Sequence, residues 1–162
     1  MPVARPLRIV LVGVIILLAG PVARGHDGPI AACETLVMNY AYHRDRADAE
    51  AVGALFTKDA TLTIGADSWK GRDRIIERVR QGIGGPVFRH LMSTIHIELV
   101  DARHARGVSY ATVYSAPPGN LPRTQEKFLA IGEYHDNFVL TDAGWRIAQR
   151  EFKIVMVPDT GS

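Results

Sequence analysis

The chain has 162 residues, 47% of them hydrophobic, which is typical of a globular protein rather than a disordered one, and its formal net charge is +2. Residues 1–25 contain three arginines and no acidic residue, so residues 26–162 carry 16 basic and 17 acidic side chains. That length is typical of one domain with a single core, and the near-neutral charge excludes the strongly basic surface that a nucleic-acid partner requires.

Residues 1–25 have the pattern of a signal peptide. After a basic start, the apolar stretch Ile9–Gly20 is too short to span a bilayer comfortably. Ala23-Arg24-Gly25 then resembles the small-x-small pattern of a cleavage site, which places the mature start at His26. We therefore expect export to the periplasm or the medium, with residues 26–162 as a single domain. An uncleaved amino-terminal membrane anchor is the alternative.

A first helix is predicted over residues 30–44, because apolar side chains recur there every three or four positions: Ile30, Cys33, Val37, Tyr40 and Ala41. Asp45 follows one turn later at the end of this inward face. The helix dipole disfavours a carboxylate there, so a compensating partner is expected. Cys33 is the single cysteine, which excludes an intramolecular disulfide and favours a role as a small core residue.

Two further helices and several strands follow. Asp48 is a good cap for a short helix running through Phe56, and a third helix is predicted around Ile75–Val79. Period-two alternation predicts the strands, with a hairpin turn at 142–144: residues 60–64, 89–100, 107–116, 125–140 and 145–157. Pro117–Pro122 is expected to form a loop at a pocket rim. Helices followed by an antiparallel meander predict an α+β fold with the helices on one face of a curved sheet.

This order of elements resembles the SnoaL-like branch of the nuclear transport factor 2-like superfamily, to which ketosteroid isomerase also belongs. The likeness covers residues 30–157 and rests on five short segments: Asp45-x-x-Asp48, Leu55–Ala60, Trp69-Lys70-Gly71, Arg89-His90 and Gly144–Ala148. The resemblance implies a cone-shaped curved antiparallel sheet with the amino-terminal helices packed on its concave face.

Two lyase groups of that superfamily, the bile acid 7α-dehydratases and the hexachlorocyclohexane dehydrochlorinases, resemble the chain at the positions of a site. Both have an aspartate matching Asp45 and a histidine matching His90, and a late arginine matches Arg150. Tyr40 matches a tyrosine of the dehydratases. Tyr110 departs from the pattern, because the matching position is acidic in the dehydratases, and this leaves the substrate class open.

These four residues would supply proton transfer without a cofactor. A histidine becomes a useful base when one ring nitrogen donates to a carboxylate, which fixes the tautomer. His90 would remove a proton and Asp45 would orient it, while Tyr40 and Arg150 would stabilise the leaving group or an enolate-like oxygen. Such a base typically contributes about 10²- to 10⁴-fold in rate.

The strand pattern leaves alternatives open for two of the residues. Arg150 alternates in phase with apolar Phe152, and pairing with Asp136 would make it structural rather than catalytic. His90 is out of phase with the more hydrophobic set of its strand, so only a bulge or the curvature of the sheet would turn it inward. That hydrophobic set is Leu91, Ile95, Ile97 and Leu99.

Other side chains have simpler interpretations. Tyr40 is equally consistent with a core tyrosine, and Asp45 with a cap of the second helix. Six residues are expected to line the pocket or the core: Tyr42, Trp69, Met92, Tyr110, Phe128 and Phe138. The remaining histidines lack metal-ligand spacing, and Gly82–Pro86 lacks the pattern of a phosphate loop, so neither metal nor cofactor is expected.

The sequence therefore predicts a dehydratase-like, cofactor-independent acid/base lyase or isomerase acting on a small hydrophobic molecule in an apolar pocket. A non-catalytic small-molecule-binding or dimerisation module of the same fold is one alternative, and a polyketide cyclase-like enzyme is another. A homodimer is left open, and no stable membrane span is expected after cleavage.

Overall fold

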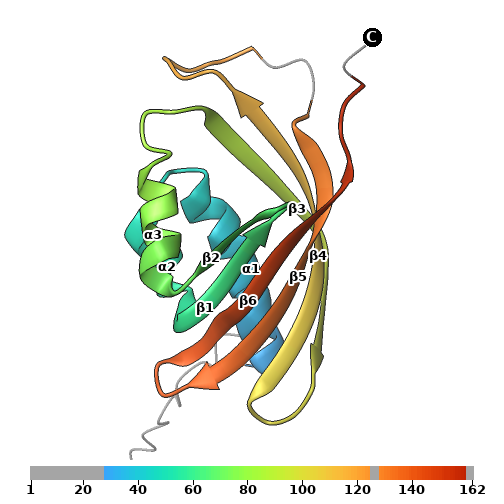
Figure 1. Cartoon of the computed structure of the whole chain (residues 1–162). Coiled ribbons are helices and arrows are strands. Elements are labelled where there is room, and N and C mark those ends of the chain that lie inside the picture. Colours follow the sequence, from blue (N-terminus) through green and yellow to red (C-terminus); the bar gives the residue numbers. More distant parts are fainter. Residues whose placement is uncertain (1–27, 125–127, 160–162) are drawn as a thin grey trace, which may run out of the picture.

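The computed structural model describes residues 28–124 and 128–159, so the predicted signal peptide lies outside the described residues. A six-stranded curved sheet has the order β2-β1-β6-β5-β4-β3, and the described helices lie together on one side of it (Figure 1). This is the predicted α+β, NTF2-like architecture. Among the described residues, no helix combines the length and apolarity needed to cross a bilayer.

The first helix, α1 (Pro29–Arg44), packs against β3, β4 and β6. Proline at its start suits a position whose N–H has no helical partner. Most of its predicted apolar stripe is buried, with Cys33, Val37 and Tyr40 at most 1% exposed, whereas Ile30 at its start is 43% exposed. The stripe continues by one turn to Arg44, which is also buried. The helix therefore brings both a tyrosine and an arginine to the inner face of the sheet.

Two shorter helices cover the opposite edge of the same face. In α2 (Ala49–Ala54), the Asp48 carboxylate accepts a hydrogen bond of 3.1 Å from the backbone N–H of Ala51, which is the predicted cap. The helix α3 (Arg72–Arg80) buries Ile75 and Val79. The prediction that α2 runs through Phe56 is wrong, because Phe56 is fully buried as the first residue of a strand.

The first strand and the strand that begins at His104 are longer than predicted, the strand predicted over 125–140 is shorter, and one strand was missed by the sequence analysis. The strands are β1 (Phe56–Ile64), β2 (Asp67–Lys70), β3 (Val87–Leu99), β4 (His104–Ala116), β5 (Ala130–Thr141) and β6 (Gly144–Met156). The pair β1 and β2 forms a hairpin, where only a turn was expected. The predicted antiparallel meander is present in β3 to β6, and β1 joins it by pairing with β6 in parallel.

A bulge in β3 decides which way His90 faces. His90 and Met92 pair with Val113 and Ala111, both buried, whereas beyond a register shift between Ser93 and His96 the buried residue is Ile97. The inward set therefore changes from even to odd positions. Thr94 lies within this shift and has a φ of 46°, in the left-handed region. The bulge that the sequence analysis required for an inward His90 is present.

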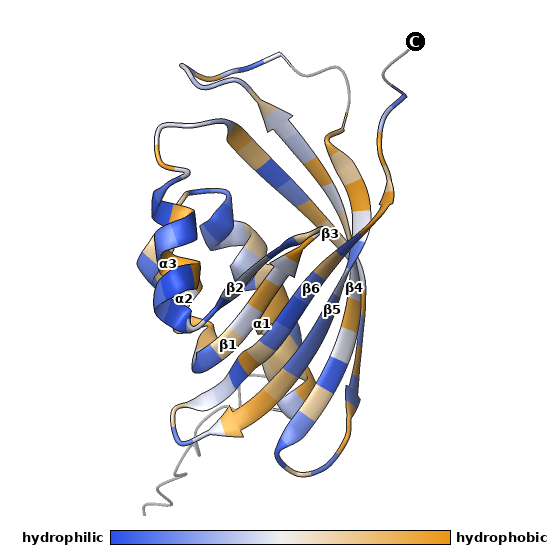
Figure 2. Ribbon diagram, viewed as in Figure 1, coloured by the Kyte–Doolittle hydropathy of each residue, from blue (hydrophilic) through white to orange (hydrophobic). Residues whose placement is uncertain are grey.

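A second irregularity acts in the same way on β6. Trp145 and Ile147 are buried before a register shift opposite β5, and Arg150 and Phe152 are buried after it. The strands consequently show bands of hydrophobic and hydrophilic residues rather than one continuous apolar stripe (Figure 2). The two shifts bring His90 and Arg150 to the inner face.

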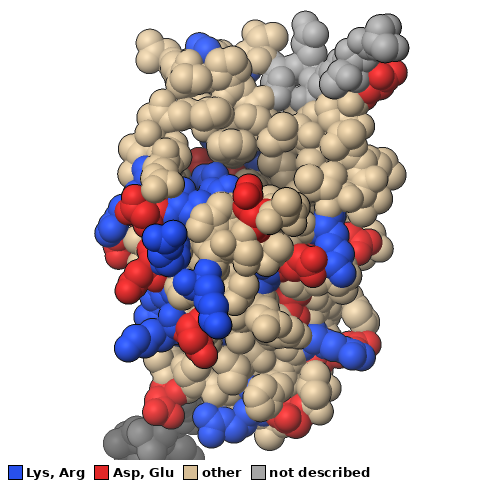
Figure 3. All heavy atoms as spheres, viewed as in Figure 1, with Lys and Arg blue, Asp and Glu red and all other residues tan. Residues whose placement is uncertain are grey.

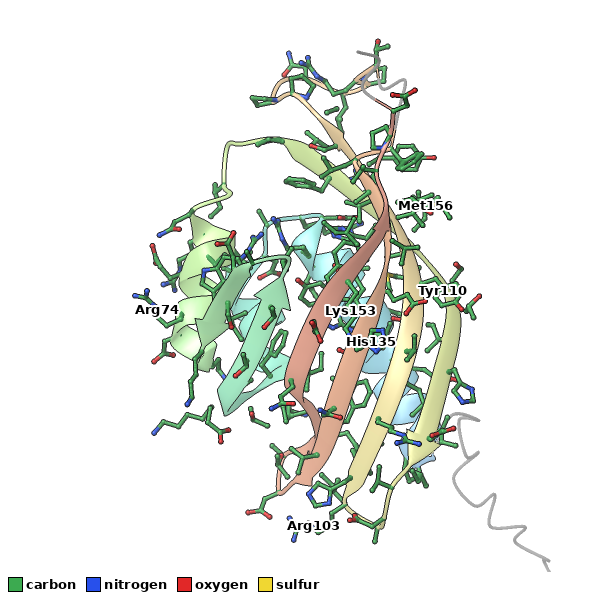
Figure 4. All side chains as sticks on the ribbon, turned by 45° about the vertical axis from the view of Figure 1, so that its right-hand side comes forward. Arg74, Arg103, Tyr110, His135, Lys153 and Met156 are labelled. Atoms are coloured by element: carbon green, nitrogen blue, oxygen red, sulfur yellow. The ribbon has the colours of Figure 1, made fainter. Side chains whose placement is uncertain are left out.

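Several predicted core residues lie elsewhere. Tyr42 is 54% exposed, with the guanidinium of Arg46 over its ring, and Tyr110 is 44% exposed on the sheet face turned away from the helices (Figure 4). The prediction that these two tyrosines line the core or the pocket is therefore wrong. Cys33 is fully buried, and burial raises the pKa of its thiol to about 12, so the thiol is neutral and packs as a core residue.

The left-handed φ of Thr94 in the bulge leads to a prediction about stability. A β-branched residue is strained in the left-handed region, and glycine is not, so Thr94→Gly should raise the free energy of unfolding by about 1 kcal/mol despite glycine's entropy cost. Urea denaturation measures it. Thr112→Gly, in the regular part of β4, is the control and should lower the free energy of unfolding by about 1 kcal/mol. Equal losses in both variants would contradict the assignment of strain to Thr94.

Candidate active site

Asp45 and His90 lie together although 45 residues separate them in the chain. The carboxylate oxygen Oδ1 of Asp45 is 2.6 Å from Nδ1 of His90, and Oδ2 accepts a hydrogen bond of 3.0 Å from the backbone N–H of His90. Both side chains are 8% exposed. An ionised carboxylate only accepts hydrogen bonds, so this contact selects the neutral tautomer with the proton on Nδ1 and the lone pair on Nε2.

The position of Asp45 follows from the end of α1. It is the carboxyl-terminal cap residue of this helix, where its charge is unfavourable to the helix dipole, and the two N–H groups of His90 supply the expected compensation. The cap of α2 is Asp48. The alternative interpretation of Asp45 as that cap is therefore wrong.

Tyr40 lies one helical turn and a residue before Asp45 and is only 1% exposed. Its ring meets those of Phe56 and Tyr134 edge to face, with centroids 6.0 and 5.6 Å away. Within the described residues its hydroxyl has no hydrogen-bond partner, so the backbone partner considered for a purely structural tyrosine is not present there. The guanidinium carbon of Arg150 lies 4.3 Å from the centre of its ring.

Arg150 forms a buried ion pair with Asp136. Its Nε and Nη2 each donate to one carboxylate oxygen at 2.7 Å, and the two side chains are 0% and 1% exposed. Burial alone would lower the pKa of Arg150, but the charge of Asp136 and this hydrogen bonding raise it above its usual value. Nη1 is buried without a partner. This ion pair with Asp136 is the one expected if Arg150 has a structural role.

The structure therefore places the four predicted residues in two groups. One is the pair of Asp45 and His90, and the other is Tyr40 stacked on Arg150, with no hydrogen bond, ion pair or ring contact between the groups within the described residues. Among those residues no group of three histidine, cysteine or acidic side chains could hold a metal ion.

Two hollows are found on the described surface. The first, of about 750 Å³, lies on the outer face of the sheet and is lined mainly by polar side chains, among them Thr63, His96, Glu98, His135 and Gln149. Figure 4 shows His135 on this face. The second, of about 700 Å³, lies near one end of the sheet beside Thr57, His104 and Val139. Neither is lined by Asp45, His90 or Tyr40, so the apolar pocket expected beside them stays a prediction.

Sequence analysis missed three residues around this site. Arg44 stacks on Phe88, with its guanidinium carbon 4.9 Å from the ring centre, and Arg78 stacks on Trp69 at 4.7 Å. Tyr134 is 2% exposed, and burial raises the pKa of its phenol well above the usual value, so it remains protonated. The feature of the sequence that could have revealed the burial of Arg44 is its position four residues after Tyr40, on the buried stripe of α1.

A curved six-stranded sheet covered on one face by helices is the architecture of the NTF2-like class of cone-shaped proteins. The chain belongs to the SnoaL-like domain family, whose model matches residues 29–151. The search of curated proteins finds no match.

Solved structures with the same fold include proteins of different described functions. A variant of Rv3472 from Mycobacterium tuberculosis, described as of unknown function, is 26% identical with a TM-score of 0.70, over 79% of this chain and 72% of that one. A putative scytalone dehydratase from Novosphingobium aromaticivorans is 26% identical with a TM-score of 0.68, over 81% and 87%. The hexachlorocyclohexane dehydrochlorinase LinA-type3 from Novosphingobium barchaimii, 16% identical with a TM-score of 0.68 over 79% and 87%, shares the fold.

The buried ion pair generates a second prediction. Asp136→Asn leaves the charge of Arg150 buried without an anionic partner and should lower the free energy of unfolding by about 3–5 kcal/mol. Chemical denaturation measures the change. Glu151→Gln removes one member of an exposed pair with Lys153 and should change stability by less than about 1 kcal/mol. A small effect of Asp136→Asn would contradict the structural importance of the ion pair.

Proposed function

We propose that the protein is a cofactor-independent acid/base lyase or isomerase acting on a small, largely hydrophobic molecule. The observation that carries the proposal is the contact of 2.6 Å between Asp45 Oδ1 and His90 Nδ1, anchored by the backbone N–H of the same histidine. A carboxylate held by two N–H groups of one residue fixes both the tautomer and the orientation of the ring. The family and its structural relatives are consistent with such chemistry without assigning it.

The proposed reaction begins at Nε2 of His90. It takes a proton from a carbon of the substrate, and Asp45 stabilises the imidazolium that forms. The electron pair of the broken C–H bond then forms a double bond. In an elimination, the leaving group departs from the adjacent carbon with its own electron pair and takes a proton from the imidazolium or from Tyr40. In an isomerisation, the proton returns to a different carbon.

Tyr40 is the proposed donor to the oxygen that becomes negative. Its hydroxyl is unpartnered within the described residues, and its ring lies on the Arg150 guanidinium. Two of the three guanidinium nitrogens of Arg150 donate to Asp136. We therefore propose that Arg150 acts through Tyr40, by placing a positive charge behind the ring, rather than by contacting the substrate.

A binding or dimerisation role is the second candidate. It is favoured by the outer hollow of about 750 Å³, which lies away from Asp45 and His90 and needs neither of them. A polyketide cyclase-like reaction would use the same proton transfer on a different substrate. Export through residues 1–25 and homodimer formation remain proposals alongside these candidates.

Hydrogen–deuterium exchange at carbon tests the catalytic proposal without knowledge of the leaving group. In D₂O, the protein should speed the exchange of acidic C–H groups in some members of a panel of hydrophobic ketones and 3-hydroxy acids, followed by NMR. His90→Ala should slow that exchange by about 10²- to 10⁴-fold, and Asp45→Asn should slow it to a smaller extent.

The matched control is His96→Ala, on the same strand. Its side chain is 71% exposed on the outer face, so the rate should not change. Circular dichroism should show that all three variants are folded. Equal exchange rates in His90→Ala and the unmodified protein would reject the catalytic role and favour the binding module.

A further inference from the structure

Positive charge gathers on the helical side of the sheet, where Arg44 and Arg150 are buried and Arg78 is half-buried. Arg150 lies over the rings of Tyr40 and Tyr134, Arg44 lies over Phe88, and Arg78 lies over Trp69. Asp136 neutralises only Arg150. Burying a cation without an anion is costly, so the two remaining arginines require an explanation.

Arg44 is nine-tenths buried and has no ion pair or hydrogen bond within the described residues. Its guanidinium lies over Phe88, whose ring centre is 6.4 Å from that of His90. Asp45 is the next residue in the chain, but both of its carboxylate oxygens are engaged by His90. The guanidinium of Arg44 therefore lies near the proposed base, with its N–H groups free of partners in the described part of the chain. A cation–π contact holds the plane of a guanidinium and leaves its edge available to a ligand.

Arg78 repeats this arrangement from α3. It stacks on Trp69 and makes no ion pair within the described residues, and its Nε is buried without a partner. Burial lowers the pKa of Arg78, the phenol of Tyr40 raises it, and the charge of Arg44 lowers it again. Asp67 is the one carboxylate that raises this pKa, and its effect is the smallest of those resolved. Arg44 reaches the end of the same helix, because a Cβ at Gly82, two residues after α3, would stand 3.9 Å from its Nη1.

The surroundings favour an organic anion. Figure 3 shows basic side chains gathered on the helical side of the molecule, where α3 lies. Both guanidinium groups lie on aromatic rings, Arg44 on Phe88 and Arg78 on Trp69. Arginine's planar fork matches the two oxygens of a carboxylate, and an apolar body would contact the rings.

We infer that Arg44 and Arg78 form a subsite for the carboxylate of a small hydrophobic acid, bound next to Asp45 and His90. This inference rests on the proposed function, because it names the class of substrate for that site. The carboxylate fixes one end of the molecule, and the base acts on a carbon of its apolar body. The two arginines are binding residues and take no proton.

The test compares phenylbutanoate with its uncharged analogue phenylbutanamide. Trp69 reports binding by fluorescence in a Trp145→Phe background, because it stacks on Arg78, and calorimetry confirms the dissociation constants. The carboxylate should bind about 10- to 100-fold more tightly than the amide, since hydrogen bonds to charged groups are the stronger kind. Added salt should reduce that preference.

Substitutions locate the subsite. Arg44→Gln and Arg78→Gln should each weaken phenylbutanoate binding about tenfold or more while leaving phenylbutanamide unchanged, and Arg78→Lys should retain part of the preference. Arg74→Gln is the control, because Arg74 is an exposed residue of the same helix (Figure 4) and should alter neither affinity. Thermal unfolding should show that every variant is folded.

The outcomes separate the subsite from the proposed function. Equal affinity for the two probes, binding of neither, or a carboxylate preference that survives both glutamine substitutions overturns the subsite. His90→Ala should keep the preference, because the base does not hold the carboxylate. A preserved preference together with unchanged carbon exchange in His90→Ala would reject the catalytic function and leave the subsite standing, whereas the reverse pattern would reject the subsite alone.

Discussion

The site depends on how Asp45 is compensated at the end of α1. A carboxylate at the carboxyl terminus of a helix faces the negative end of the helix dipole. His90 relieves this with a ring N–H and a backbone N–H that meet the two oxygens of the carboxylate. Because both donors belong to one residue, the contact also fixes where β3 lies against α1. The compensation of the Asp45 charge thus holds α1 against β3 and sets the orientation of the His90 ring.

The inner face of the sheet carries more charge than a core of this size ordinarily holds. The pair of Arg150 and Asp136 satisfies itself, and replacing both members by apolar groups could even leave stability unchanged. Arg44 and Arg78 have no such compensation among the described residues. Charges that stability does not require are more readily explained by recognition. Arg44, which precedes Asp45 and lies over Phe88, connects that recognition to the proposed proton transfer.

Much of the fold could be predicted from periodicity and local chemistry. The stripe on α1, the cap at Asp48 and the inward phase of Arg150 with Asp136 all appear in the structure. The parallel pairing of β1 with β6 and the strand β2 could not be predicted, because they depend on contacts between distant segments. The sequence showed that an inward His90 needs a bulge in β3, but it could not place that bulge at Thr94, because threonine rarely adopts a positive φ.

The candidate site was predictable only in part. Family resemblance suggested the pairing of Asp45 with His90, while simple alternation opposed it, and the structure shows why alternation failed. Arg44 and Arg78 escaped notice because charged residues at the edge of a helical stripe usually reach water, and only the packed structure shows that Arg44 is buried and that both guanidinium groups lie on aromatic rings.

NMR of the histidine ring nitrogens tests the central claim most directly, because it observes the tautomer of His90 without a substrate. At neutral pH, Nδ1 should carry a proton protected from exchange by Asp45, Nε2 should be unprotonated, and Asp45→Asn should abolish that protection. A His90 ring protonated at Nε2, or one whose protons exchange as fast as those of exposed His96, would contradict the account.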